Sequence, residues 1–230
     1  LSTPSSPNTL LLSDIRGGNS TLIPLLPGQY LFKSTLLGTL QCFLIKSTLP
    51  LAPRLSMQCI NKDRQRVLNI GLGITNSQEV LDLSIALSSH RIDMIGVVID
   101  TASGQYGSTQ ILYGSIAIDP VTMLPTITDG QAVFAPLSYS TDWMLEGYKP
   151  EEAVWDPWGG LDNRLGVVVK LGANNAPTVL ARFHLILHSP PYLTLVSFFK
   201  LELNDLGFCP GKSDNVLLYS PRLRSMFLYK

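Results

Sequence analysis

The stretch Leu161–Leu203 decides the fold, and it reads LDNRLGVVVKLGANNAPTVLARFHLILHSPPYLTLVSFFKLEL. It contains three apolar runs, separated by a Gly-Ala-Asn-Asn-Ala-Pro segment and by a Ser-Pro-Pro segment, both rich in turn-forming residues. Successive side chains of a β-strand point to opposite faces, so an apolar residue at every second position predicts a strand with one buried face. The three alternating runs therefore predict an antiparallel meander with one dry face and one wetter face.

The alternation also predicts which side chains of the meander form the core. In the first run the dry face consists of Leu165, Val167, Val169 and Leu171, opposite Gly166, Val168 and Lys170. In the second run it consists of Val179, Ala181, Phe183, Leu185 and Leu187, opposite Arg182, His184 and His188. In the third run it consists of Leu193, Leu195, Phe199, Leu201 and Leu203, opposite Thr194, Lys200 and Glu202.

Short apolar segments bounded by Gly, Pro, Asn and Asp continue along the rest of the chain. They predict strands over residues 29–32, 38–45, 54–60, 67–72, 80–87, 92–99, 110–118, 131–139, 216–219 and 226–229. The segment 80–87 would also permit a short helix, but its clean alternation favours a strand. The pattern predicts an all-β fold, an antiparallel, jelly-roll-like β-sandwich with long loops. We expect a flexible arm or linker over residues 1–12 and a single sandwich domain over residues 13–230.

The composition limits the classes of partner. Of the 230 residues, 45% are hydrophobic and only 15% are charged, against roughly 25% in a typical domain. Such a surface suits a protein that is partly covered by other subunits or that works outside the cell. The 17 basic and 17 acidic residues cancel, which argues against nucleic acid as a partner. Apolar runs are too short to span a bilayer, so membrane insertion is not expected, and the start without Met indicates an excised domain or a proteolytic fragment.

Cysteine chemistry is predicted to play no part in the scaffold. Cys42, Cys59 and Cys209 have no CxxC spacing, and an odd number of cysteines leaves at least one thiol unpaired. Cys42 and Cys59 lie inside apolar strand patterns, where free cysteine behaves as a small buried hydrophobe. We therefore predict a buried free thiol at each position.

The segment 141–160 differs from the rest, because it carries all three tryptophans and shows no alternation. We interpret it as a long excursion between sheets, with a helical turn allowed near Glu151. Aromatic rings are enriched in interfaces and stack on sugars, and neighbouring acids accept hydrogen bonds from hydroxyls. The candidate ligand or receptor contacts are Trp143, Tyr148, Trp155, Asp156 and Trp158. The alternative is that the tryptophans fold back and close the end of the sandwich.

Catalytic, metal and cofactor motifs fail on inspection. The segment 98–104 is similar to the turn of aspartic proteases at Asp100, but Ala102 replaces the required glycine and a second such turn is missing. The segment 207–213 has three residues between its glycines where a phosphate-binding loop needs four. His184 and His188 lie about 13 Å apart if both are on one strand, too far to ligate one metal. We predict a protein without cofactor or metal that is not an enzyme.

In composition and layout the chain resembles a coat or surface-protrusion (spike) domain of a non-enveloped RNA virus. The resemblance rests on Ser-, Thr-, Pro- and Gly-rich loops, low charge, many short strands and the aromatic excursion at Trp143–Gly160. It implies a structural, self-associating protein on the virion surface, with copies of itself or other coat subunits as partners and loops available to a host receptor or glycan. The alternative is a secreted or surface carbohydrate-binding sandwich that uses Trp143, Trp155 or Trp158. A more remote alternative is a protease-like enzyme at Asp100.

Overall fold

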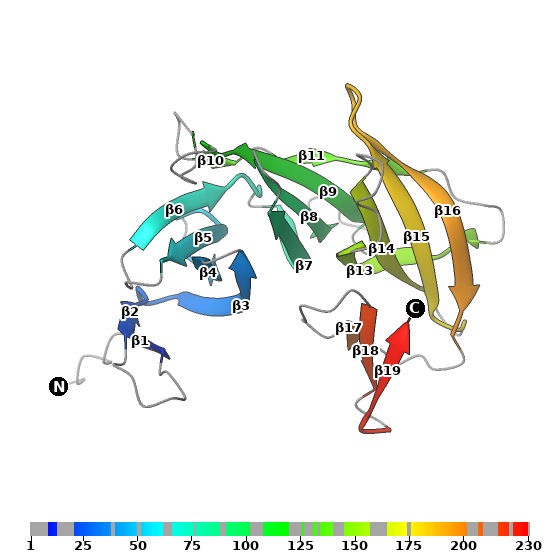
Figure 1. The fold of residues 1–230 in the computed structure, drawn as a ribbon, viewed down its shortest axis with the longest axis horizontal. Coiled ribbons are helices and arrows are strands. Elements are labelled where there is room, and N and C mark those ends of the chain that lie inside the picture. Colours follow the sequence, from blue (N-terminus) through cyan, green and yellow to red (C-terminus); the bar gives the residue numbers. More distant parts are fainter. Residues whose placement is uncertain are drawn as a thin grey trace. The chain divides into compact units, whose positions relative to one another are not determined.

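The computed structural model describes residues 9–12, 21–37, 40–49, 52–61, 66–75, 77–87, 91–101, 108–119, 126, 131–132, 134–139, 145–156, 165–173, 176–201, 207–208, 216–220 and 223–229. The described residues lie almost entirely in β-strands, and none of them belongs to an α-helix (Figure 1). None therefore forms a helix long and apolar enough to cross a bilayer. The all-β class predicted from the sequence is confirmed.

The contacts group the chain into two compact units. Unit 1 comprises residues 1–75, 89–91 and 116–133, and unit 2 comprises residues 76–88, 92–115 and 134–230. Each unit contains sheets of its own. The single domain expected over residues 13–230 stays a prediction.

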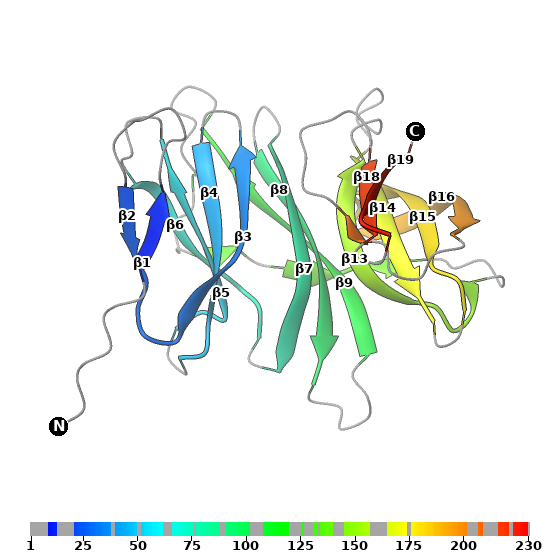
Figure 2. The same cartoon turned by 90° about the horizontal axis from the view of Figure 1, so that it is seen from below.

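Unit 1 contains a hairpin and a five-stranded sheet. The hairpin pairs β1 (Thr9–Leu12) with β2 (Thr21–Pro24). The sheet has the order β10-β6-β5-β4-β3, with bounds Gln131–Ala132 (β10), Arg66–Leu72 (β6), Leu55–Ile60 (β5), Leu40–Ser47 (β4) and Gln29–Leu37 (β3). Its four long strands form a meander, since β3 to β6 follow one another along the chain (Figure 2). Residues 9–12 of the predicted arm thus form a paired strand, whereas residues 1–8 lie outside the described residues.

A disulfide joins Cys42 in β4 to Cys59 in β5, which shows that the prediction of free thiols was wrong for these two residues. The two cysteines are directly opposite each other in the antiparallel ladder. Both side chains are 0% exposed, so their burial was predicted correctly. The sequence could not indicate the bridge, because it depends on the register of the two strands. Cys209 lies outside the described residues.

Unit 2 is built from three sheets. One has the order β11-β9-β8-β7, with bounds Phe134–Pro136, Ser108–Ala117, Arg91–Asp100 and Gln78–Leu87. The second has the order β12-β16-β15-β14-β13, with bounds Ser138–Tyr139, Tyr192–Lys200, Val179–Ile186, Leu165–Gly172 and Lys149–Asp156. The third has the order β17-β18-β19, with bounds Gly207–Phe208, Val216–Ser220 and Ser225–Tyr229. The strand over residues 80–87 and the meander are therefore confirmed.

The core of unit 2 lies between two of these sheets, which is the packing of a β-sandwich. Ile95, Val97 and Ile111 come from the β7–β9 sheet. The β13–β16 sheet, which is curled in Figure 1, contributes a larger set: Ala153, Val167, Val169, Leu171, Val179, Ala181, Phe183, Leu185 and Leu193. The predicted dry faces are thus confirmed for Val167, Val169 and Leu171 in the first run and for Val179, Ala181, Phe183 and Leu185 in the second. The prediction is wrong for Leu187, which follows the end of β15 and is 41% exposed.

The wetter face predicted for the first run is wrong, because β14 is buried on both faces. Val168 is 0% exposed and Lys170 only 8%, although both point away from the sandwich core. Leu180, which pairs with Lys170 in β15, is also buried. The strand β14 pairs with a strand on each side and is buried on both faces. Such a strand has a continuous apolar run in its sequence, which explains the three successive valines.

The face predicted for the end of the third run is wrong by one residue. Phe198 packs against the sandwich core and pairs with Ala181, whereas Phe199 pairs with Leu180 on the other face. The cause is a β-bulge: Arg182 pairs with Ser197 and Phe183 pairs with Leu195, which leaves Val196 as an extra residue. An extra residue reverses the inward and outward alternation beyond it.

Candidate ligand pocket beside strand β13

The structure brings together only part of the predicted aromatic site. Tyr148 and Trp155 are half-buried and pack against the core of unit 2. Asp156 is the last residue of β13, and its side chain lies outside the described part of the chain. Trp143 and Trp158 also lie outside it. Ligand contact through these five residues stays a prediction.

The segment 149–156 is an ordered strand, which corrects our interpretation of 141–160 as an excursion without strands. Residues Lys149–Asp156 form β13 and pair antiparallel with β14. The helical turn allowed near Glu151 is absent, since Glu151 lies in this strand. The alternation of β13 is hard to recognise in the sequence because the strand contains a bulge, and because Pro150 and two successive acids interrupt the apolar pattern.

Trp155 takes a packed position in the sandwich. Its indole Nε1–H donates a hydrogen bond to the backbone oxygen of Ser84 in β7, at 3.3 Å. Its ring meets Tyr113 of β9 edge to face, with 6.4 Å between the centroids. The Tyr113 hydroxyl in turn donates to the carboxylate of the fully buried Asp93, at 2.7 Å. For Trp155 the geometry favours the role of closing the sandwich over stacking on a ligand.

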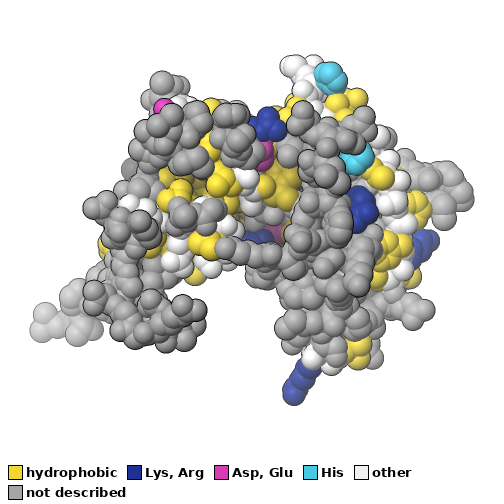
Figure 3. All heavy atoms as spheres, in the orientation of Figure 1, with side chains coloured by type: hydrophobic (Ala, Val, Ile, Leu, Met, Phe, Trp, Pro, Cys, Tyr) yellow, Lys and Arg dark blue, Asp and Glu magenta, His cyan; other side chains and the backbone are white. Residues whose placement is uncertain are grey.

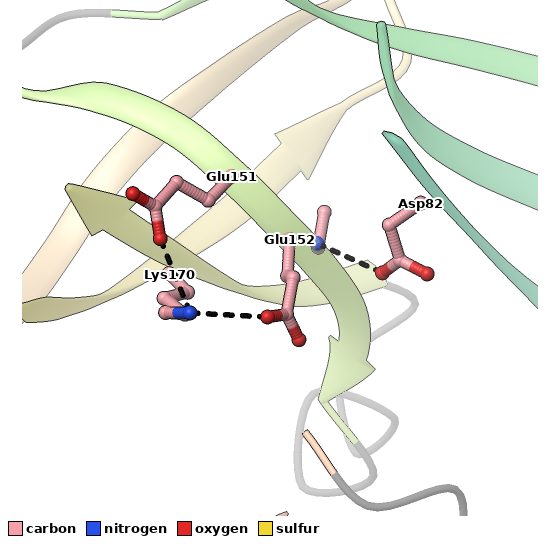
Figure 4. Close-up of polar contacts among 5 residues, drawn as sticks. Asp82, Glu151, Glu152 and Lys170 are labelled. Carbon is pink, nitrogen blue, oxygen red and sulfur yellow. Dashed lines mark hydrogen bonds and ion pairs between the residues drawn. The ribbon is translucent and has the colours of Figure 1, made fainter. Parts of the chain in front are cut away.

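The bulge in β13 places two carboxylates on one lysine. Pro150 pairs with Leu171 and Glu152 pairs with Lys170, so Glu151 is the extra residue. As a result Lys170 Nζ lies 3.1 Å from Glu151 Oε2 and 3.1 Å from Glu152 Oε1 (Figure 4). Burial alone would lower the pKa of Lys170, but the charges and hydrogen bonds of Glu152 and Glu151 raise it overall. The lysine therefore stays charged inside the sheet.

A fourth charged group lies on the neighbouring sheet. Asp82 in β7 accepts a hydrogen bond from the backbone N–H of Ala153, with 3.3 Å between Oδ2 and N (Figure 4). Around the bulge, Asp82, Glu151 and Glu152 are acidic and Lys170 is basic. The side chains around the bulge thus include more acids than bases.

A pocket of about 280 Å³ opens next to the bulge. Its wall comes from β7, β9, the turn before β13, the start of β13 and the end of β14, through Leu81, Thr109, Gly147, Lys149, Pro150, Glu151, Gly172 and Ala173. Thr109 Oγ1 is buried and has no hydrogen-bond partner among the described residues. Because buried hydroxyl groups nearly always have a partner, this oxygen marks a wall with unused hydrogen-bonding capacity.

The residues around the bulge and the pocket carry little signal in the sequence. In the sequence, Glu151 and Glu152 are only two of several neighbouring acids, and the alternation predicts Lys170 on the wetter face. Thr109 has no distinguishing feature in the sequence, because single threonines are common in strands. A pair of acids inside a strand, followed in the next strand by a lysine among valines, is the pattern that could have pointed to the buried ion pairs.

The remaining candidates lie elsewhere in unit 2. Asp100 ends β8 opposite Gln78, and Thr101 bonds the Ser77 oxygen through both its N–H and its hydroxyl, each at 2.7 Å. Residues 102–107 are outside the described part, so the protease-like interpretation stays a prediction. His184 lies in β15, and the exposed His188 stacks on Tyr192 with 6.5 Å between the rings.

Comparison with known proteins adds no family. No family model matches this chain, and no curated protein matches it.

Proposed function

We propose that this chain is a structural, self-associating protein of a virion surface, a viral capsid or capsid-spike protein with exposed loops that attach to a host receptor. The observation that carries the proposal is the presence of large exposed apolar side chains on two strands, one in each unit: the edge strand β3 and the strand β16, which the edge strand β12 covers only at its first two residues. Edge strands with such side chains are sites at which chains associate.

The first of these strands is β3, the last strand on one side of the unit 1 sheet. Tyr30 is 50% exposed, Leu31 39% and Leu36 44%. Leu26, which precedes the strand, is also exposed. A stable monomer usually protects an edge with charges or proline, but this stretch carries a single lysine, Lys33.

The second strand is β16 in unit 2. The short β12 pairs only with Tyr192 and Leu193, so the rest of β16 has no strand partner on that side among the described residues. Val196, the bulge residue, is 49% exposed, and Tyr192 is 39% exposed. Apolar groups of this size favour a second chain as cover.

The scarcity of charge supports the same role. Figure 3 shows few charged side chains among the coloured residues of the face drawn, in line with the 15% of the whole sequence. Subunits of an assembly bury much of their exterior, so they need fewer charges than a free monomer.

The molar mass in solution tests the proposal. Light scattering across a concentration series should give multiples of the 25.2 kDa chain. Leu31→Lys and Val196→Lys should each shift the population toward the monomer, because they place a charge in an apolar contact. Gln41→Lys, at an exposed position of β4, is the matched control and should leave the mass unchanged. A mass of one chain at every concentration would refute the proposal.

A further inference from the structure

We infer that the pocket beside the β13 bulge binds a small, neutral, polyhydroxylated molecule of the size of a single sugar ring. The inference does not rest on self-association, because every wall residue belongs to unit 2 of one chain.

The size of the pocket limits the ligand. Pockets for drug-sized molecules have volumes of about 300–1,000 Å³, and the 280 Å³ here falls just below that range. One ring with its substituents fits such a space, and an extended oligomer would have to continue outside it. The ligand is therefore a monomer or the terminal unit of a chain.

The chemistry of the pocket wall suits a ligand that presents both hydroxyl and C–H groups. Leu81, Pro150 and Ala173 give it apolar surface, while Glu151 offers a carboxylate acceptor and Lys149 an ammonium donor. Thr109 adds a hydroxyl group, which can both donate and accept. This oxygen is buried, and a rotation of about 120° about χ1 of a threonine moves the hydroxyl group to the former position of the methyl group and the methyl group to that of the Cβ hydrogen. A bound hydroxyl would give Thr109 Oγ1 the partner that it lacks.

The charges around the pocket disfavour an anion. Around the pocket and the bulge lie three acids, Asp82, Glu151 and Glu152, against the two lysines Lys149 and Lys170, which leaves one negative charge in excess. An anionic ligand would have to approach these acids, whereas a neutral polyol meets no such repulsion.

Gly172 keeps the Glu151 side of the pocket open. A Cβ at this position would overlap the Glu151 carboxylate oxygen, so the carboxylate would have to move. Gly172→Ala is therefore a second way to disturb the wall, independent of Thr109.

Saturation-transfer NMR tests the inference, with the methyl glycosides of glucose, galactose, mannose and N-acetylglucosamine as probes at millimolar concentration. At least one should bind the wild-type chain. Thr109→Val, which keeps the shape and removes the hydroxyl, should weaken that binding by about tenfold, the effect of one hydrogen bond. Thr194→Val, at an exposed position of β16, is the matched control and should bind as the wild type does.

Unfolding in urea separates a lost contact from a lost fold. Thr109→Val should be as stable as the wild type or more so, because it removes a buried hydroxyl without a partner. Gly172→Ala should also weaken binding. The inference is refuted if no glycoside binds, if Thr109→Val binds as well as the wild type, or if the anionic methyl glycoside of sialic acid binds best.

Discussion

The carboxylate of Asp82 and the backbone N–H of Ala153 join the outer strands of two different sheets, β7 and β13, through one hydrogen bond of 3.3 Å. Outer strands carry N–H groups that no ladder partner reaches. Ala153 is 0% exposed, so water cannot replace the carboxylate there.

Asp82→Ala should lower the free energy of unfolding by about 1–3 kcal/mol, the cost of a buried donor without an acceptor. Urea denaturation followed by circular dichroism measures it. Glu79→Ala, at an exposed position of the same strand, should change the stability by less than about 0.5 kcal/mol. Equal effects of the two substitutions would contradict a specific role for Asp82.

The stability of the protein should fall at alkaline pH. The folded-state pKa of Lys170 is raised above its ordinary value of 10.5, so its contribution is complete below pH 10.5 and is lost as the pH rises through the folded pKa. Burial raises the pKa of Tyr139 above 10.0, so above pH 10.0 the unfolded chain releases the phenol proton more readily, which also favours unfolding. Urea denaturation between pH 8 and pH 11.5 should therefore show a steep loss that begins above about pH 10.

Lys170→Met should remove the lysine part of this pH dependence and destabilise the protein at neutral pH by about 1–3 kcal/mol, because two carboxylates lose their shared cation. The partial exposure of Glu151 and Glu152 keeps the figure below that of a fully buried pair. Lys149→Met, at an exposed position of the neighbouring strand β13, is the control. Identical pH profiles for Lys170→Met and the wild type would speak against the ion pairs.

The Cys42–Cys59 disulfide should be visible by thiol titration. Of three cysteines the bridge uses two, so one thiol per chain should react in denaturant without reductant, and three after reduction. Closing a loop of 17 residues stabilises a protein by about 3 kcal/mol, and the double variant Cys42→Ala with Cys59→Ala should lose at least that much. Three reactive thiols before reduction would show that the bridge does not form.

Trp155 should matter more for stability than for binding. Trp155→Phe removes the Nε1–H that Ser84 accepts and should cost about 1 kcal/mol in unfolding free energy. Trp155→Ala should cost about 3–5 kcal/mol, because it also leaves a cavity beside Tyr113. Glycoside binding by Trp155→Phe should match the wild type, since Trp155 does not line the pocket. A folded Trp155→Phe variant that no longer binds would restore the tryptophan to the site.

The sequence predicted the strands well and their exceptions poorly. Periodic apolar residues are sufficient to locate β7, β14 and β15, because burial of one face imposes alternation. Bulges break that rule. The extra residues Glu151 and Val196 reverse the alternation; Pro150 precedes the first, whereas no glycine or proline adjoins the second.

The candidate site was harder still, because it depends on contacts across sheets. Thr109, Glu151 and Gly172 come from three different strands, and their meeting follows from the sheet order, which single-strand patterns do not encode. The disulfide could not be predicted for the same reason, because Cys42 and Cys59 are brought together by the pairing register of β4 and β5. Trp155 was singled out as a ligand contact because aromatic residues suit both cores and interfaces.

The bulge at Val196 determines which of two adjacent phenylalanines near the end of β16 faces the core. Phe198 and Phe199 are adjacent and identical, so either could fill the space beside Ala181 without a change of side chain. With Val196 as the bulge residue, Phe198 faces the core and Phe199 faces the opposite side of the sheet. A deletion of Val196 would leave Ser197 opposite Arg182 and Phe198 opposite Ala181 in a regular ladder, so a chain without this residue would keep the same interior.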